Sequence, residues 1–186
     1  MNRFDKEARE WDRNRRRVEV AKAVADFAIK CGVKGEILDF GCGTGLVSQH
    51  LKDAATKLTG FDTSQNMVEE YDKKFPGCGL TAYPDKKFDA VVTSMTLHHI
   101  KDLQALAKRL YDSLKSGGIL VVADLYKEDG GFHQRGNDGV YHFGFYPNEL
   151  QNLFEKAGFK KMEDKRVYTV KKEDKSYPII ALAFQK

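Results

Sequence analysis

The stretch ILDFGCGTGLVSQHL, Ile37 to Leu51, decides the fold of this chain. A compact apolar run leads into three glycines at alternate positions, 41, 43 and 45, and a further apolar-patterned segment follows them directly. A buried strand that runs into glycines and then into a helix is where the ligand site of an open α/β sheet usually begins. Because glycine lacks a Cβ, this turn can be tight and can bring its main chain against a ligand.

Similar apolar runs recur along the chain and alternate with helical patterns. Strands are predicted at 36–41, 57–62, 88–94 and 118–125, and helices around Val20–Ala28, from Ser64 to Lys74, from Asp102 to Gly117-Gly118 and from Pro147 to Gly158. Strands that alternate with helices predict a parallel sheet covered on both faces.

The end of the chain has a different pattern. Residues 165–170 and 176–185 are strand-like and are separated by too few residues for a crossover helix, so they predict an antiparallel hairpin. The expected fold class is α/β: a Rossmann-like, doubly wound, mostly parallel sheet that ends in an antiparallel hairpin strand.

Bulk composition places the chain among soluble globular proteins. With 186 residues, 41% hydrophobic and 31% charged, it suits one well-buried domain. The longest apolar run, Ile179 to Phe184, is far below the about 20 residues that a membrane helix needs, and no apolar core follows the cationic start as in a signal peptide. Three cysteines without paired or metal-like spacing suggest reduced thiols, and a cytoplasmic location is expected.

The net charge of +4 has a definite location. Residues 1–34 hold ten Lys and Arg against six Asp and Glu, whereas the rest of the chain holds 21 of each. The excess is concentrated in RNRRR, Arg13 to Arg17. A solvated helix face is the favoured interpretation, ahead of a nucleic-acid contact, because the run is short and no RNA-binding motif accompanies it. An arm that helps to hold an acidic ligand is the third alternative.

Two classes of ligand compete for the glycine turn. A dinucleotide needs G-x-G-x-x-G and an acid about 20 residues later for the ribose. Counted from Gly41, the third glycine is misplaced, because Leu46 stands at the sixth position. Asp62, at the end of the second predicted strand, fits the ribose-binding acid of any adenosine ligand.

Asp39 favours the second class, S-adenosylmethionine. A carboxylate beside the turn repels a pyrophosphate but attracts the ammonium group of this ligand's amino-acid tail. In this interpretation Asp39 serves the amino group, directly or through water, and Asp62 accepts hydrogen bonds from both ribose hydroxyls. Each acid also has a structural alternative: Asp39 can accept from backbone N–H groups of the turn, and Asp62 can compete with Ser64 to cap the next helix.

Four motifs, in order along the chain, resemble those of a known family. The segments D-x-G-x-G-x-G, GFDTSQNMVEEY, FDAVVTSMTLHHI and LKSGGILVVADL look like the successive motifs of class I S-adenosylmethionine-dependent methyltransferases. The branch that they resemble most is the type 11 group, which includes the ubiquinone/menaquinone C-methyltransferases. FDKEAREWD is similar to the lead-in of that group, so the likeness covers residues 4–125, and the terminal hairpin agrees with it.

The resemblance implies S-adenosyl-L-methionine as cofactor and S-adenosyl-L-homocysteine as product, and it implies a set of cofactor-binding positions. The methionine portion contacts the main chain of Gly41, Cys42 and Gly43 near Asp39, and the ribose binds to Asp62. The adenine is lined by Thr63 and Met67, and the tail and methyl group face Ser94 and Met95. A lid contains Trp11 and Arg16, and its cation meets the cofactor carboxylate. Some positions have alternatives: Met67 also suits a helix core. His98 and His99 each have either a functional or a helix-packing role, and the functional role of His99 would be contact with the cofactor.

One region departs from the family pattern. Lys73 to Lys87 is too short for the usual third strand, the acidic adenine contact at its end and a short helix. GLTAY, residues 79–83, is at most a clipped third strand. The residues leave open whether the protein has trimmed this edge of the pocket or whether the sequence closes over a missing loop.

Catalytic residues are predicted in the glycine- and aromatic-rich segment from Ala123 to Phe145. It opens on the same side as the glycine turn, and loops of this length are often functional lids. His133 or His142 titrates near neutrality and suits a proton acceptor, with Asp129 to orient the imidazole. Solvated histidines on a mobile loop are the alternative. No metal site is expected, because neither C-x-x-C nor H-x-x-x-H spacing occurs.

The sequence therefore predicts a single methyltransferase domain, 1–186, that methylates a small molecule. Its expected parts are an N-terminal helical lid (1–34), a cofactor-binding core (35–125), a substrate lid loop (126–147) and a C-terminal helix with the hairpin (148–186). No membrane partner is expected, and the sequence does not predict the oligomeric state. The alternatives are a non-catalytic cofactor-binding or partner subunit, an NAD-linked oxidoreductase, and a nucleic-acid methyltransferase that uses Arg13–Arg17.

Overall fold

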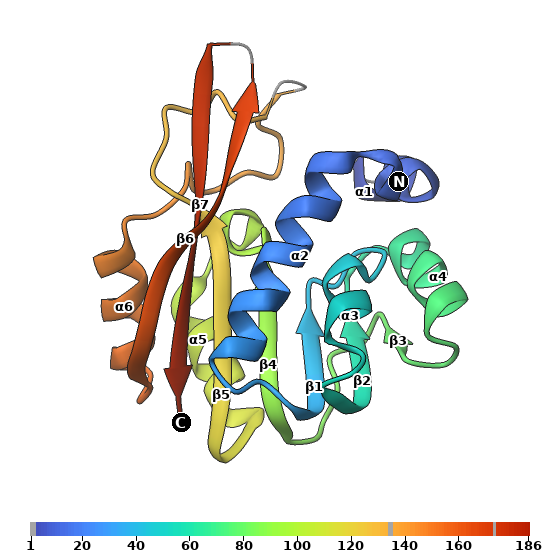
Figure 1. Cartoon of the computed structure of the whole chain (residues 1–186), viewed down its shortest axis with the longest axis vertical. Coiled ribbons are helices and arrows are strands. Elements are labelled where there is room, and N and C mark those ends of the chain that lie inside the picture. The colour runs from blue at the N-terminus through green and yellow to red at the C-terminus, as the bar shows by residue number, and fades with distance from the viewer. Residues whose placement is uncertain (1–2, 134–135, 173) are drawn as a thin grey trace.

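Helices cover both faces of one mixed sheet (Figure 1). The computed structural model describes residues 3–133, 136–172 and 174–186. The strands are β1 (Gly35–Phe40), β2 (Ala55–Phe61), β3 (Gly79–Leu80), β4 (Phe88–Ser94), β5 (Leu114–Leu125), β6 (Lys160–Lys172) and β7 (Lys175–Gln185). The helices are α1 (Arg3–Glu7), α2 (Arg15–Lys30), α3 (Leu46–Leu51), α4 (Gln65–Lys74), α5 (Leu103–Asp112) and α6 (Pro147–Lys156), with the 3-10 helices η1 (Ala8–Arg13) and η2 (Leu97–His99). None of these described helices is long and apolar enough to cross a membrane.

The strand order β3-β2-β1-β4-β5-β7-β6 locates the functional edge of the sheet. β1 pairs in parallel with β2 on one side and with β4 on the other, so the winding reverses between β1 and β4. β7 lies antiparallel between β5 and β6, which confirms the predicted fold class. Open α/β sheets bind ligands beyond the carboxyl ends of the strands where the winding reverses. Here that point lies beyond the ends of β1 and β4.

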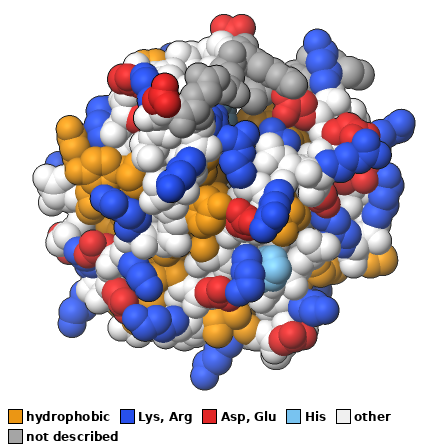
Figure 2. Space-filling model, turned by 45° about the horizontal axis from the view of Figure 1, so that its top comes forward, with side chains coloured by type: hydrophobic (Ala, Val, Ile, Leu, Met, Phe, Trp, Pro, Cys, Tyr) orange, Lys and Arg blue, Asp and Glu red, His pale blue; other side chains and the backbone are white. Residues whose placement is uncertain are grey.

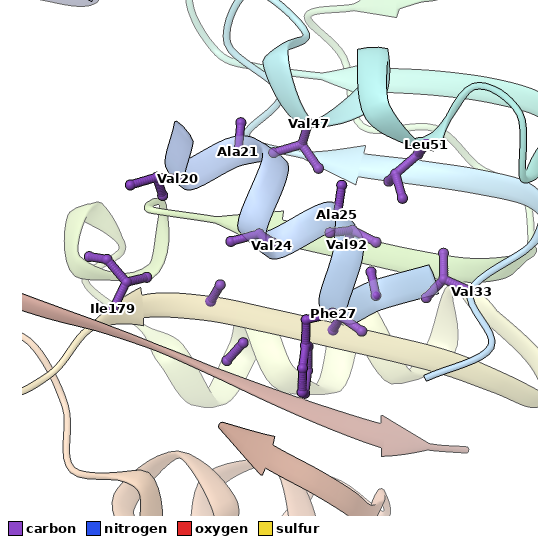
Figure 3. Packing of buried hydrophobic residues seen from close by; sticks show 14 of the residues in the cluster. Val20, Ala21, Val24, Ala25, Phe27, Val33, Val47, Leu51, Val92 and Ile179 are labelled. Carbon is purple, nitrogen blue, oxygen red and sulfur yellow. The ribbon is translucent and has the colours of Figure 1, made fainter. Parts of the chain in front are cut away.

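Apolar side chains form one cluster on each face of the sheet. On one face α2 and α3 supply the cover, and Figure 3 shows Val24 and Val47 of these helices near Val92 of β4. On the other face α5 and α6 supply it. Ile37 belongs to the first cluster and Leu38 to the second, as a strand buried on both faces requires. The first strand is therefore fixed in register from both sides.

The predicted helix from Asp102 to Gly117-Gly118 is too long. α5 begins after Asp102, as predicted, but it ends at Asp112. Leu114 continues the helical spacing, yet it is fully buried and pairs with Phe88 at the start of the β4–β5 ladder. Burial of Leu114 in the sheet therefore outweighs one more helical turn. The other predicted helix starts agree with α4 and α6, and Ser64 caps α4 by accepting from the Met67 N–H.

The third strand is shortened to β3, two residues that pair in parallel with β2. Tyr83, which follows β3, packs on the face of the sheet that α5 covers. Its ring lies 6.0 Å from that of Phe40 and 5.3 Å from that of Phe61, and its hydroxyl lies 2.7 Å from the Ser113 hydroxyl. The segment after the short third strand is thereby held against β1 and β2.

Candidate active site

The glycine turn after β1 is more crowded at Gly41 than at Gly43. Gly41 and Cys42 donate backbone hydrogen bonds to the Phe61 carbonyl, at 2.8 and 3.0 Å. At Gly41, with φ +70°, a Cβ would stand 2.3 Å from Oγ1 of Thr96. At Gly43, with φ +50°, a Cβ would be in ordinary van der Waals contact with the sulfur of Met67 at 3.9 Å and the indole nitrogen of Trp11 at 4.0 Å. The turn is therefore less crowded at Gly43 than at Gly41.

Asp39 lies beneath the turn, with 1% of its surface exposed. Its Oδ2 accepts a hydrogen bond from the Ser48 hydroxyl at 2.7 Å, and the same hydroxyl lies 3.0 Å from that of Tyr71. Burial raises the pKa of Asp39 to about 6; the hydrogen bonds from Ser48 oppose this rise, and the charge of Asp62 adds to it. Asp39 therefore anchors the first turn of α3 to β1. Its contact with an ammonium group stays a prediction.

Asp62 joins the glycine turn to the start of α4. Its two carboxylate oxygens accept from the backbone N–H groups of Gly43 and Ser64, each at 2.9 Å. Burial raises the pKa of Asp62, while these N–H groups lower it. Of the two predicted adenine contacts that follow, Thr63 is exposed, whereas Met67 is 1% exposed and its sulfur lies 3.9 Å from the position of a Cβ at Gly43.

The N-terminal segment, α1 with η1, is seated on the turn and on α4. Asp12 accepts from the Thr44 hydroxyl and from Lys74, and Lys74 also donates to the Thr44 carbonyl at 2.7 Å. Asp5 accepts from the Ser64 hydroxyl at 2.6 Å. These bonds give the predicted lid a defined resting position. That it opens and closes stays a prediction.

Trp11 of η1 lies beside Gly43 of the turn. Its indole nitrogen lies 4.0 Å from the position of a Cβ at Gly43. The guanidinium of Arg17 lies 3.4 Å from the centre of the Trp11 ring and pairs with Glu7 at 2.9 Å. Arg16 is exposed and reaches a backbone carbonyl of β6 instead. Adjacent helix residues point about 100° apart, so Arg17 lies beside Trp11 and Arg16 does not. The contact of Arg16 with the cofactor carboxylate stays a prediction.

The backbone after β4 is strained at the same edge. Met95 has φ +56°, the one positive φ among the described non-glycine residues, and its N–H donates to the Ala123 carbonyl at 2.8 Å. The Thr96 hydroxyl donates back to the Ser94 carbonyl at 3.1 Å. Such a backbone is uncommon outside glycine and concentrates at functional sites. Ser94 and Met95 thus lie at the predicted edge, and their contact with a cofactor stays a prediction.

Three histidines, here called the histidine group, gather beyond the ends of β4 and β5: His98, His99 and His133. One ring nitrogen of each lies within 4.8 Å of those of the other two. The ring centroids are 4.1 Å apart for His98 and His99, and His133 lies 5.1 and 5.5 Å from these two. His98 is buried and the other two are partly buried. Since His133 belongs to the predicted substrate loop, that loop reaches the site.

The rings of His98 and His99 are both held through Nδ1. Oδ1 of Asp124, a fully buried residue of β5, lies 2.6 Å from Nδ1 of His98. Asp124 also accepts from the backbone N–H groups of His98 and Leu125. Nδ1 of His99 lies 2.8 Å from the Gly139 carbonyl. Because carboxylates and carbonyls only accept, both Nδ1 atoms carry the hydrogen, and Nε2 is the nitrogen with the lone pair.

The other two catalytic candidates lie apart from this group. Nε2 of His142 lies 2.9 Å from the Ile100 carbonyl, and the ring lines a separate surface hollow of about 280 Å³. Asp129 forms an exposed ion pair with Lys175 at 2.7 Å, which ties the loop to the terminal hairpin. Asp124 holds the imidazole of His98, whereas Asp129 is paired with Lys175; that Asp129 orients His133 or His142 stays a prediction.

Comparison with known families fits this geometry. A family model described as a methyltransferase domain matches residues 11–164, a range that includes the glycine turn, Asp39, Asp62 and the histidine group. The chain belongs to the class I S-adenosylmethionine-dependent methyltransferases. The resemblance of the four sequence motifs to this family is thus confirmed.

Individual relatives agree with the assignment to the methyltransferases. An uncharacterized methyltransferase of Schizosaccharomyces pombe is 39% identical over 166 residues, which cover 75% of this chain and 58% of that protein. The ubiquinone/menaquinone biosynthesis C-methyltransferase UbiE of Desulfotalea psychrophila is 32% identical over 124 residues, 61% of this chain and 48% of that one. The chain thus spans about half the length of such curated relatives.

Solved structures of methyltransferases share the fold. An S-adenosylmethionine-dependent methyltransferase from Clostridium acetobutylicum superposes with a TM-score of 0.70 at 16% identity, and the match covers 99% of each chain. At this identity the likeness establishes the fold alone.

The sequence motifs of this family member do not reveal the pairing of His98 with Asp124. A signal for it exists in the strand register: Ser94 of β4 pairs with Ala123 of β5. Residues that follow these two positions meet at the same edge of the sheet, so an acid and a histidine there are brought together. His133 has no comparable signal, because its approach depends on the path of a loop.

Proposed function

We propose that this chain transfers the methyl group of S-adenosylmethionine to a small-molecule acceptor. The observation that carries the proposal is the glycine turn: the main chain of Gly43 is less crowded than that of Gly41, Trp11 and Met67 lie beside it, and Asp62 accepts its N–H. Bound there, the cofactor supplies a methyl group that its sulfonium has already activated. The chain's own contribution is positioning and the exclusion of water.

Asp62 has the hydrogen-bonding capacity that the proposed complex needs. An ionised carboxylate offers about four lone-pair sites, and the backbone N–H groups of Gly43 and Ser64 use two of them. The backbone of Thr63 also hydrogen-bonds to this carboxylate, and the capacity that remains is proposed for a ribose hydroxyl. Gly41 to Gly43 supply main chain, and Trp11 and Met67 lie beside Gly43.

A small acceptor is favoured by the way the N-terminal arginines are paired. Arg13, Arg15 and Arg17 form ion pairs with Glu10, Glu19 and Glu7, in that order. Figure 2 shows acidic side chains interspersed among Lys and Arg on the face that it draws. A nucleic acid is held mainly by cations that are available to phosphates. The paired arginines therefore argue against the nucleic-acid alternative.

We place the acceptor on the side of the histidine group. His133 comes from the loop 126–147, and Phe132 lies edge-on to it with ring centroids 5.1 Å apart. Phe4 of α1 lies edge-on to His99 at 5.1 Å. Aromatic side chains from two segments thus bound this space. Of the three catalytic candidates, His133 is the one that this arrangement favours.

Asp62→Asn tests the cofactor site. We expect S-adenosylmethionine to bind about 10–100-fold more weakly, because a hydrogen bond to a charged acceptor contributes about 1.5–3 kcal/mol. Asn can keep only one of the two backbone N–H bonds, because its NH2 group donates and cannot accept, so circular dichroism must show that the variant is folded. Isothermal titration gives the affinity, and Asp53→Asn, on the exposed surface, is the control. Equal affinities of the Asp62→Asn variant and the wild type would remove the central support for this site.

Turnover separates the proposal from its alternatives. The expected result is release of S-adenosylhomocysteine that depends on a compound from a small-molecule library. Turnover only with tRNA or protein would contradict the proposed acceptor class. Cofactor binding without turnover on any acceptor would favour the partner-subunit alternative, and binding of NAD alone would overturn the cofactor assignment.

A further inference from the structure

We propose that the histidine group binds one divalent transition-metal ion of the Zn²⁺ class. Neutral imidazole nitrogens are preferred ligands of such ions, and three protein ligands with an open position are the usual arrangement of a catalytic zinc site. His98, His99 and His133 bring one ring nitrogen each to within 4.8 Å of the others. This proposal differs from the expectation of no metal, because local spacing cannot reveal ligands from two distant segments.

The distances fit a metal after small side-chain movements. With Zn–N bonds of about 2.0–2.1 Å, tetrahedral ligand nitrogens lie about 3.4 Å from one another. From 4.8 Å at most, each nitrogen moves inward by about 1 Å or less. His98 and His99 are adjacent in η2, and His133 approaches from a loop, which can follow the ion with little change in the sheet.

The surroundings of the histidine group support metal binding independently of the distances. Metal-bound histidines usually donate their second ring nitrogen to a carboxylate or a carbonyl, which fixes the tautomer and the ring. Asp124 does this for His98 and the Gly139 carbonyl does it for His99, both through Nδ1. Nε2 is then the ligand nitrogen of each. Phe4 and Phe132 flank the group and limit its contact with water.

The ion would change the role of His133 from proton acceptor to ligand. A hydroxyl or thiol of an acceptor that takes the open coordination position loses its proton more readily than in water, because the ion stabilises the anion. This second step rests on the proposed methyl transfer. Metal binding itself does not, so it is tested without cofactor or acceptor.

The experiment uses tag-free protein that has been freed of metal by dialysis against a chelator. We expect one equivalent of Zn²⁺ per chain in a competition titration with a chromophoric chelator, and with Co²⁺ a visible spectrum of tetrahedral type. His99→Gln and His133→Gln should each weaken Zn²⁺ binding by more than the roughly 10–100-fold expected for Asp124→Asn, since loss of a ligand exceeds loss of its hydrogen-bond partner. Circular dichroism confirms that each variant is folded.

His50→Gln and His142→Gln are the matched controls, because they remove the two histidines outside the group and should leave the stoichiometry and affinity unchanged. Absence of stoichiometric binding to the wild type, or equal affinity of the wild type and the His99→Gln/His133→Gln double variant, overturns the metal site. Isothermal titration of S-adenosylmethionine into the metal-free wild type is run in parallel. Retained cofactor binding without Zn²⁺ binding would sink this inference and leave the proposed function standing.

Discussion

Asp39→Asn is expected to stabilise the protein at neutral and alkaline pH and to lose this advantage in acid. Burial raises the pKa of Asp39 to about 6, against 3.8 for the ordinary side chain. A carboxyl group whose pKa is higher in the folded than in the unfolded chain favours folding when protonated. Its contribution is fully present below about pH 3.8 and is lost as the pH rises to about 6. A shift of about two pKa units means that ionisation of Asp39 lowers the unfolding free energy by about 3 kcal/mol between acid and neutral pH. Asn does not ionise, so the variant avoids this loss.

The measurement compares urea unfolding of the wild type and the Asp39→Asn variant between pH 3.5 and pH 8. At each pH the unfolding free energy of the wild type is subtracted from that of the variant, and the expected signal is the change of this difference with pH. A cost of placing an amide near Ser48 is the same at every pH and therefore does not contribute to that change. Asp89→Asn is the control of opposite sign: the Glu36 N–H and Lys115 lower the pKa of Asp89, so its charge stabilises the fold and acid removes that effect. A difference for Asp39→Asn that does not depend on pH would show that the buried carboxylate carries no such cost.

Gly41→Ala is expected to cost roughly 3 kcal/mol or more of unfolding free energy. A residue with a side chain pays about 1–2 kcal/mol for a left-handed backbone, and Gly41 has φ +70°. The added Cβ would also stand 2.3 Å from Oγ1 and 2.4 Å from Cγ2 of Thr96, and overpacking of this kind costs about 1–3 kcal/mol. Denaturant unfolding should show a lower midpoint at an unchanged slope.

Gly77→Ala separates the two causes. Gly77 has φ +72°, and a Cβ there would have nothing within 4 Å, so its substitution reports the backbone cost alone. Adding Thr96→Ala to Gly41→Ala removes the two nearest atoms of the clash and should recover part of the loss, as a double-mutant cycle measures. If Gly41→Ala and Gly77→Ala are equally destabilising, the contact with Thr96 does not determine the turn.

The sheet could be predicted from the sequence because its signals are local. Apolar runs mark the parallel strands, and Ser64 and Asp102 mark the starts of α4 and α5. The end of α5 could not be predicted in the same way. Leu114 fits both a helical stripe and a buried strand, and only its pairing with Phe88 decides between them.

The cofactor side of the site could be predicted better than the acceptor side, because its signals in the sequence are also local. Gly41, Gly43 and Asp62 belong to short motifs that end strands, and the structure brings the turn and this acid together. The histidine group depends on which strands are neighbours and on where a loop runs. Asp129 was the obvious carboxylate near a histidine in the sequence, but its partner in space is Lys175.

The position of β7 constrains the sequence of events in folding. β7 follows β6 along the chain but lies between β5 and β6 in the sheet. β6 consequently has no edge to join until β7 has formed against it or against β5. β7 forms a local hairpin with β6, but its other neighbour, β5, is synthesised much earlier, and contacts between residues so far apart in the sequence are slow to form. Before this strand is in place, the loop that carries His133 lacks the hairpin to which Lys175 fastens it.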